Sequence, residues 1–139
     1  MSDLEAIPPS PVGAPVHLDR IGQIAIPVGD VAQATAFYRD VLGMHHLFSA
    51  PPGLSFFDCG GIRLMLEASP TAASEERRSS ILYYHVADLD ESCAALQARG
   101  VVLEAAPHLV ARMTDHDLWM AFIRDSESNI IGLMNERRP

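Results

Sequence analysis

The segment from His108 to Trp119 holds a dense group of side chains that could bind a small molecule. His108 and Arg112 lie four residues apart, so both would point to one face of a strand. A guanidinium group binds a carboxylate or a phosphate through two parallel hydrogen bonds, which makes Arg112 a candidate for the anionic group of a ligand. The alternative is a surface turn with solvated charges, and the residues themselves leave both interpretations open.

Polar side chains also interrupt segments that are otherwise apolar. Gln23 is the one polar side chain in the strand-like stretch Ile21–Val28. Its amide oxygen could bind a hard or borderline cation, or it could form a hydrogen bond in a polar cavity. His45 and His46 are adjacent, so strand geometry turns them to opposite faces, and we interpret both as ordinary strand residues.

The stretch Ile21–Gly43 has the pattern of a strand, a turn and an amphipathic helix. Asp30 has the residue type of a helix N-cap, and Gln33 stands three residues later, where a capping-box partner belongs. Apolar side chains then recur at helical spacing, and Gly43 stands where a left-handed residue commonly ends a helix. The pattern predicts a strand over 21–28 and a helix over 31–42.

The same unit occurs again about 58 residues later, which suggests a duplicated domain. Asp88 and Glu91 take the two capping positions, and Gly100 ends the pattern. Strand-like segments follow each unit. We expect strands near 44–48, 54–59 and 62–68 in the first half, and near 81–86, 101–113 (interrupted at Pro107), 118–124 and 130–135 in the second, with a helix over 89–98. The sequence therefore predicts an α+β fold of two tandem βαβββ modules, 19–68 and 80–137.

The domain boundaries follow from composition. Residues 1–18 are rich in Pro, Ala and Ser and have no periodicity, so we expect a flexible N-terminal arm. Residues 19–139 then form a single domain, and the polar stretch 69–80 connects its two modules.

Size and charge limit the function. The chain has 139 residues, of which 48% are apolar and 20% charged, as expected for one globular domain. The formal net charge of −8 argues against nucleic acid as a partner, because nucleic acid requires a basic face. The charge is compatible with a solvated acidic surface or with a cationic ligand.

The two cysteines and the hydropathy give no sign of secretion or membrane insertion. Cys59 and Cys93 are isolated thiols and form neither a disulfide framework nor a zinc-thiolate motif. The sequence has no apolar segment of signal-peptide or membrane-spanning type, so we expect a cytoplasmic protein with no membrane partner.

Three segments carry a resemblance to a known family. They are VGDVAQATAFYRDVLG, VADLDESCAALQARGV and FIRDSESNIIGLM. Together they resemble the vicinal oxygen chelate superfamily, which contains glyoxalases, bleomycin resistance proteins and extradiol dioxygenases. The resemblance covers nearly everything after the arm. The last turn departs from the family's usual Asp-Pro-Asp-Gly-Asn, since Ser126 and Ser128 replace the Pro and the Gly, and Asn129 is the residue expected to adopt a left-handed conformation.

The resemblance implies a fold and a kind of chemistry. In this family two βαβββ modules curl their mixed sheets into a cup that usually holds a divalent metal ion. Substrate oxygens complete the coordination, and the metal stabilises an enolate-like or oxyanion charge. Homodimers are common, so the resemblance implies a small-molecule substrate or ligand and a homodimer.

The family's four ligand positions can be placed on this chain. The first falls on Gln23, an oxygen donor, and the matching position in the second module falls on Ile81, which cannot bind a metal. The acidic position of the last strand falls on Gly132, and its counterpart in the first module falls near Leu64. Glu67 is the nearest acid there, but strand alternation from Leu64 places it on the other face.

Two other residues could form a displaced site. His85 lies four residues after Ile81 and Glu136 four after Gly132, so each keeps the inward orientation of the position it replaces. The strands that carry them would be adjacent and parallel, which could bring His85 and Glu136 together. The resemblance thus implies Gln23, His85 and Glu136 as metal ligands, with His85 or Glu136 as general base.

The wall of the cup would be built mainly from the second module. We predict substrate-binding roles for His108, Arg112, Trp119, Phe122 and Tyr83.

Three hypotheses follow, of which the third is a domain whose pocket binds a ligand for regulation, with no DNA-binding segment in the sequence to support it. The first is a glyoxalase-like, metal-dependent enzyme with lyase, isomerase or dioxygenase chemistry on an oxygen-bearing substrate. The second is a non-catalytic dimer that binds a small molecule or drug without a metal, as bleomycin resistance proteins do. The missing ligands and the acidic charge favour the second hypothesis, while Gln23 and the inward His85 favour the first.

Overall fold

The computed structural model describes residues 20–70 and 80–139, and the expected arm at 1–18 lies outside them. The first module consists of β1 (Gln23–Val28), α1 (Val31–Ala36), β2 (His45–Ala50), β3 (Leu54–Cys59) and β4 (Ile62–Ala68). The second consists of β5 (Leu82–His85), α2 (Leu89–Ala98), β6 (Leu103–Arg112), β7 (Asp117–Arg124) and β8 (Ile130–Arg137). The predicted α+β fold of two tandem βαβββ modules is therefore confirmed.

The predicted helix caps form as expected. The Asp30 carboxylate accepts a hydrogen bond of 2.9 Å from the backbone N–H of Gln33, and Asp88 accepts one of 3.0 Å from that of Glu91. The first helix is shorter than predicted, because α1 gives way to a π-helical turn, η2 (Phe37–Val41). The wider turn leaves the amphipathic pattern in place, since the same face stays packed on the core.

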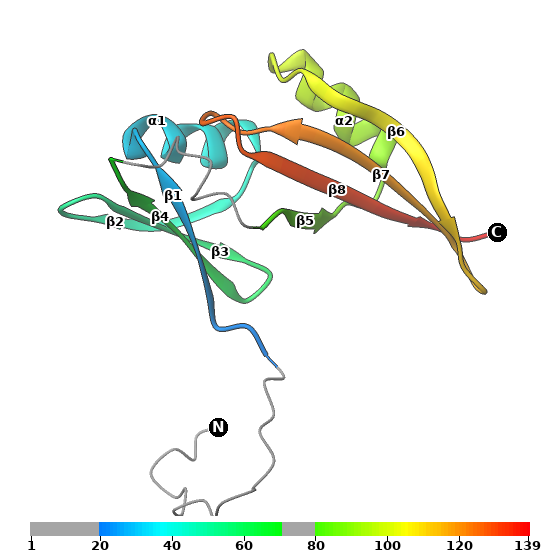
Figure 1. The fold of residues 1–139 in the computed structure, drawn as a ribbon, viewed down its shortest axis with the longest axis horizontal. Helices are drawn as coiled ribbons and strands as arrows, with labels where there is room; N and C mark the ends of the chain where they lie inside the picture. Colours follow the sequence, from blue (N-terminus) through cyan, green and yellow to red (C-terminus); the bar gives the residue numbers. More distant parts are fainter. Residues whose placement is uncertain (1–19, 71–79) are drawn as a thin grey trace, which may run out of the picture.

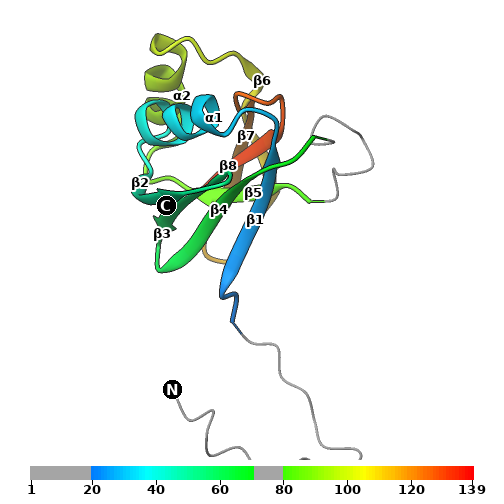
Figure 2. The same ribbon diagram turned by 90° about the vertical axis from the view of Figure 1, so that its left-hand side faces the viewer.

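Each module has its own four-stranded mixed sheet. The strand orders are β1-β4-β3-β2 and β5-β8-β7-β6. The first and last strands of each module pair in parallel, and the other pairs are antiparallel. Figures 1 and 2 show α1 and α2 on the same side of the molecule, each above the sheet of its own module. No helix of the described residues covers the opposite face of either sheet.

Strand alternation separates the core from the open faces. Residues that point towards the helices are buried or half-buried, whereas most of their neighbours along each strand are more exposed. The buried apolar side chains of the strands are those of Val28, Phe57, Leu64, Leu66, Ala121, Ile123, Ile131 and Leu133. The described helices therefore pack on one face of each sheet, and the side chains of the opposite, open face are the ones that a ligand could contact.

The sixth strand is continuous, although the sequence predicted an interruption near Pro107. Proline lacks the N–H needed for a second neighbour, but β6 is an edge strand and has only β7 beside it. The pairing register with β7 shifts between Ala105 and His108, so the irregularity expected near Pro107 occurs in the pairing and does not end the strand.

The turn between β7 and β8 differs from the expectation in one residue. Ser128, and not Asn129, adopts the left-handed conformation, with φ of 68°. Asn129 instead donates to Asp125 from its backbone N–H (2.8 Å) and from its side-chain amide (3.0 Å). The turn is therefore stabilised by a carboxylate at its first position.

The same turn joins the second module to the first. The Tyr38 hydroxyl, on η2, donates a buried hydrogen bond of 2.8 Å to Asp125. The Glu127 carboxylate accepts from the backbone N–H groups of Gly29 (2.9 Å) and Asp30 (3.0 Å), at the start of α1. Glu127 therefore adds a second negative charge, beside that of the Asp30 N-cap, at the helix N-terminus, which favours such charge.

No helix within the described ranges is long and apolar enough to span a membrane.

Candidate functional site

The open face of the first sheet carries a polar row and an aromatic row. Strand register places Gln23, Arg63, Asp58 and His45 side by side across β1, β4, β3 and β2. Phe48 and Phe56 stack in the next row, with ring centroids 4.7 Å apart, and the Arg63 guanidinium lies 5.5 Å from the Phe56 centroid. Apart from Gln23, sequence reasoning assigned no binding role to these residues. Strand alternation along β3 and β4 would have placed these residues on the open face if the orientation of one residue in each strand had been known.

The open face of the second sheet is aromatic and rich in methionine. Register aligns Tyr83, Gly132 and Phe122 in one row, and the row beside it runs from His85 to His108 through two methionines, Met134 and Met120. The Tyr83 and Phe122 rings meet edge to face at 5.9 Å, and the His108 ring lies 6.2 Å from Phe122. The structure therefore brings together three of the five residues predicted to bind substrate.

Gly132 forms a close-fitting base for the Tyr83 ring. A Cβ atom on Gly132 would lie 2.3 Å from Cδ2 and 2.6 Å from Cε2 of Tyr83. Distances this short are not tolerated between carbon atoms, so the ring rests directly on the glycine backbone. Glycine at this position is therefore a steric requirement of the aromatic wall.

The edges of the two sheets border a cavity with a volume of about 920 Å³. It is lined by β1, by β5 and by the start of β8, together with the Tyr38 ring from η2. Gln23 and Tyr83 both line this seam cavity, so the structure places one predicted metal ligand and one predicted substrate contact in the same space. Most of the remaining lining is aliphatic, as in small-molecule sites generally.

The four expected metal positions do not provide a metal site. Gln23 is a donor, whereas Ile81 and Gly132 are not, and the Tyr83 ring covers Gly132. The sequence placed the fourth position, the acidic position of the first module, one residue too early, because Leu64 points into the core. Met65 is the residue equivalent to Gly132. Met65 pairs with Ala25 in the first module as Gly132 pairs with Tyr83 in the second.

The expectation for Glu67 was also wrong. Glu67 pairs with Pro27 and Gln23 pairs with Arg63, so Glu67 lies on the same open face as Gln23. The error came from counting strand alternation from Leu64, which faces the helix. In the part of the chain that the structure describes, no three His, Cys, Asp or Glu side chains are grouped closely enough to hold a metal ion.

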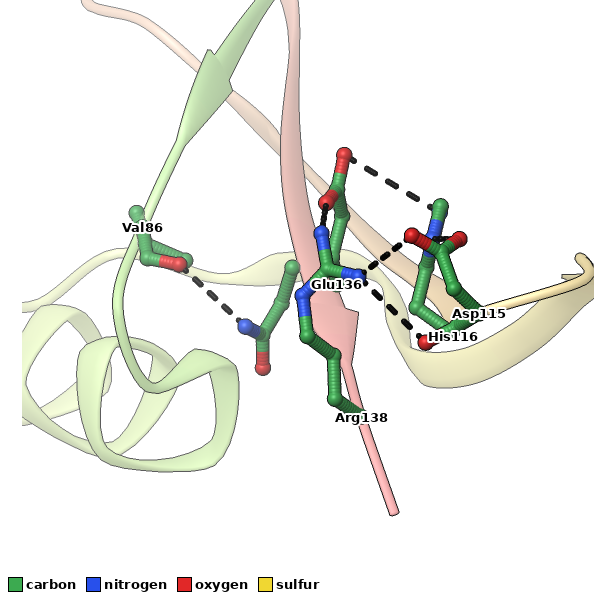
Figure 3. A network of polar contacts seen from close by, with 6 residues as sticks. Val86, Asp115, His116, Glu136 and Arg138 are labelled. Carbon is green, nitrogen blue, oxygen red and sulfur yellow. Dashed lines mark hydrogen bonds and ion pairs between the residues drawn. The ribbon is translucent and has the colours of Figure 1, made fainter.

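Glu136 belongs to an ion-pair network at the end of the second sheet (Figure 3). Its carboxylate lies 2.8 Å from Arg138 and 3.9 Å from His116, and Arg138 also contacts Asp115 at 2.7 Å. His85 was the predicted partner of Glu136. It pairs with Met134 across the strands, and it lines a cavity beside α2 and not the seam cavity that Gln23 lines. The contacts of Glu136 thus stabilise the β6–β7 hairpin and the C-terminal segment.

Two predicted substrate contacts lie away from the aromatic face. Trp119 alternates with Met120 and Phe122, so it points to the helix side, where the Arg137 guanidinium covers its ring at 4.2 Å. Arg112 pairs with Asp117 at 3.2 Å and is largely exposed near the hairpin tip. Trp119 therefore packs against the core, and Arg112 stabilises the hairpin.

The network in Figure 3 predicts a pH effect. Hydrogen bonds from Arg138 and then from His116 lower the pKa of Asp115 to about 2. A folded-state pKa below the unfolded value stabilises the fold above about pH 4, and this contribution is lost as the pH falls towards 2. In a ¹³C NMR titration of side-chain carboxyls, Arg138→Ala should raise the pKa of Asp115 and still leave it below the ordinary value, because the hydrogen bond from His116 remains. Arg137→Ala should leave the pKa of Asp115 unchanged. An unchanged pKa in Arg138→Ala would contradict the assigned cause.

Comparison with known proteins agrees with this architecture. No curated protein matches the chain. An antibiotic-binding protein, TnmS3, from a Streptomyces species has a similar structure, with 26% identity, a TM-score of 0.66, and coverage of 87% of this chain and 98% of that one. Lactoylglutathione lyase from Agrobacterium tumefaciens is similar as well, with 24% identity, a TM-score of 0.66, and coverage of 84% and 92%. An integron cassette protein from the mobile metagenome of V. cholerae has 20% identity, a TM-score of 0.70, and coverage of 88% and 98%.

A family model gives the same result at the level of sequence. The model described as Glyoxalase/Bleomycin resistance protein/Dioxygenase superfamily matches residues 20–131, from the start of the first module into the last strand. The chain therefore belongs to the Glyoxalase/Bleomycin resistance protein/Dioxygenase superfamily.

Proposed function

We propose that this chain is a binding protein for a small organic molecule, which it holds against the aromatic face of the second module without a metal. The observation that carries the proposal is the Tyr83 ring resting on Gly132, the position where the resemblance places an acidic ligand. An aromatic side chain at that point favours flat, apolar groups over a metal-bound oxygen.

The surrounding residues support the same choice. Phe122 and His108 extend the aromatic wall, and Met120 and Met134 provide adaptable apolar contacts beside it. Tyr83 is 44% exposed, so its ring is accessible to a ligand. The net charge of −8 raises the local concentration of a cationic ligand.

Among the similar structures, the antibiotic-binding protein exceeds 25% identity and matches along nearly its whole length. This similarity supports a binding role for the present chain and leaves its ligand to be identified. A cationic glycopeptide of the bleomycin type is a suitable first probe, because it combines flat rings with positive charge.

We expect this glycopeptide to bind with micromolar affinity or better in isothermal titration calorimetry with excess EDTA. Tyr83→Ala should weaken binding about tenfold or more, since aromatic anchors contribute a large share of binding energy. Val102→Ala is the matched control, because Val102 is 79% exposed and follows α2, away from the aromatic face. Failure of the probe to bind, or equal affinity in Tyr83→Ala, would exclude binding of this ligand class at this face.

A metal-dependent enzyme of lyase, isomerase or dioxygenase type is the second candidate, and Gln23 is the residue that favours it. In that case Gln23, with His85 or Glu136, would bind a divalent ion that stabilises developing oxyanion charge. The described residues do not fit such a site, so we derive no catalytic step from it. Elemental analysis after titration with divalent ions separates the candidates: about one tightly bound ion per chain would favour the enzyme and contradict the metal-free proposal.

The assembly and location are also proposals. We propose a homodimer in the cytoplasm, as the resemblance and the sequence imply. Large apolar side chains are exposed on the open faces and at the sheet edges, which a second subunit would cover. These side chains are Ile21, Phe48, Ile81 and Val110. Light scattering during size-exclusion chromatography should give about twice the 15.1 kDa mass of one chain.

A further inference from the structure

The seam cavity is bordered by the free edges of two strands. β1 and β5 each stand at the end of their own sheet, and within the described residues neither has a hydrogen-bonded neighbour on its outer side. The lining includes the consecutive residues 23–27 of β1 and the consecutive residues 80–84, which run into β5. A cavity on one face of a strand would be lined by every second residue, so the consecutive residues show that strand edges face this space.

The backbone groups that point outwards from these edges can be identified. The Ser69 N–H donates to the Val28 carbonyl (2.8 Å), and the Val86 N–H donates to the Met134 carbonyl (3.0 Å). Because these directions alternate along a strand, the even-numbered residues of β1 and β5 direct their N–H and C=O groups towards β4 and β8. The odd-numbered residues direct theirs outwards. They are Gln23, Ala25 and Pro27 in the first module, and Ile81, Tyr83 and His85 in the second.

Several polar side chains of the lining already have partners. The Tyr38 hydroxyl and the Asn129 amide donate to Asp125, and the Arg124 guanidinium donates to Glu104 at 3.0 Å. Arg124 is the one charged residue in the described lining, and most of the rest is apolar. The unpaired hydrogen-bonding groups of the seam are thus mainly those of the two backbone edges. Alternating N–H and C=O groups on both sides of a space are complemented by another extended peptide backbone.

The edge of β5 lacks the features that usually prevent an edge strand from pairing with another chain. Such features include proline, charged side chains and irregular register. Pro107 lies in β6, Pro27 removes one donor from β1, and the pairing of β2 is shifted in register. β5 contains no proline and no Lys, Arg, Asp or Glu, and its pairing with β8 has no register shift. Its outer edge is therefore suited to pair with an added strand.

We propose that the seam cavity binds a short, uncharged peptide segment in extended conformation, which pairs through its backbone with the outer edges of β1 and β5. A five-residue strand is about 17 Å long, and with about 4.8 Å between strands and about 10 Å between layers it takes up about 800 Å³. The cavity of about 920 Å³ has room for it. An added strand lies in the plane of a sheet, so this site does not depend on the ligand proposed for the open aromatic face.

The test uses the peptide Ac-Thr-Val-Thr-Val-Thr-NH2, which is uncharged and consists of residues that favour strands. Its control carries N-methyl groups on the two valines and so lacks the N–H groups that would face one of the edges. In ¹⁵N NMR of the full chain, the first peptide should shift the amide signals of Ala25 and Tyr83 saturably and slow their hydrogen exchange. The methylated peptide should bind about tenfold more weakly or worse. No saturable shift at these amides up to millimolar peptide, or equal affinity of the two peptides, would overturn the proposal.

Proline variants test each edge. Ala25→Pro removes one outward N–H and leaves the ladder between β1 and β4 intact, because that N–H points away from β4. Ile81→Pro does the same beside β8. Each should weaken binding of the unmethylated peptide about fivefold, as expected for one hydrogen bond. Ala25→Val and Ile81→Val keep the N–H and should retain the wild-type affinity. Unchanged affinity in either proline variant would contradict pairing with both edges.

Other occupants of the seam would be detected in the protein without peptide. If the amides of Ala25 and Tyr83 are already protected from hydrogen exchange, these edges are paired in the free protein. Protection that is independent of protein concentration would identify a segment of the same chain, and protection that increases with concentration would identify a second copy. Either result would overturn the peptide site, whereas rapid exchange at both amides is the expected one.

Discussion

Asp125→Ala should lower the free energy of unfolding by about 3 kcal/mol or more, a large fraction of the stability of a domain this size. Asp125 is 6% exposed, and its carboxylate accepts hydrogen bonds from Tyr38, from Asn129 and from the backbone N–H of Glu127. The variant removes all of them and leaves the Tyr38 hydroxyl buried without a partner. Urea denaturation, followed by the fluorescence of the single tryptophan, Trp119, measures the loss.

Tyr38→Phe is the matched control for this prediction. It deletes only the hydroxyl group and keeps the ring in the core, so we expect a loss of about 1 kcal/mol. In the Tyr38→Phe background, Asp125→Ala should cost less than in the wild type, because no hydroxyl is left unpaired. Equal costs in the two backgrounds would show that the hydrogen bond between the modules contributes little to stability.

The local structure could be predicted from the sequence because its signals are local. Asp30 and Asp88 stand at the right distance before apolar periodic segments, and the repeat of that pattern defines the two modules. Each capping hydrogen bond joins residues only three positions apart. Such contacts depend little on tertiary structure, so the fold class and most element boundaries agree with expectation.

The candidate site was harder to predict because it depends on contacts across the fold. Tyr38 and Asp125 are 87 residues apart in sequence, and nothing local indicates that they meet. A shift of one residue at Leu64 moved an expected ligand position from the open face to the core and reversed the assignment of Glu67. Strand alternation places Glu136 on the face that the sequence predicted. Its carboxylate forms an ion pair with Arg138, two residues later, and not the predicted contact with His85.

Gly132 links the absence of an acidic ligand to the aromatic wall. The resemblance places an acid at this position, and glycine has neither the charge nor a Cβ atom. The Tyr83 ring rests on this glycine and fills the space that a larger side chain would need. The same residue therefore lacks a ligand atom and admits the aromatic ring, which is why we expect metal-free binding.

This interpretation predicts strong coupling between Gly132 and Tyr83. Gly132→Ala should lower the free energy of unfolding by about 1–3 kcal/mol, because the added methyl group overlaps the ring. In the Tyr83→Ala background most of that loss should disappear, giving a coupling energy of about 1 kcal/mol or more. Both values come from urea denaturation of the four proteins in the cycle.

Gly22→Ala is the control for the general effect of replacing a glycine. A Cβ atom at Gly22 would meet nothing within 4 Å, so the variant should have wild-type stability or be slightly more stable. Tyr83 is half exposed, and a ring displaced by Gly132→Ala would also lose its edge-to-face contact with Phe122. Binding of the glycopeptide should therefore weaken in Gly132→Ala and not in Gly22→Ala. If Gly132→Ala costs the same stability with and without the Tyr83 ring, overlap with that ring is not the reason for glycine at this position. The aromatic wall would then not explain why an acidic residue is absent there.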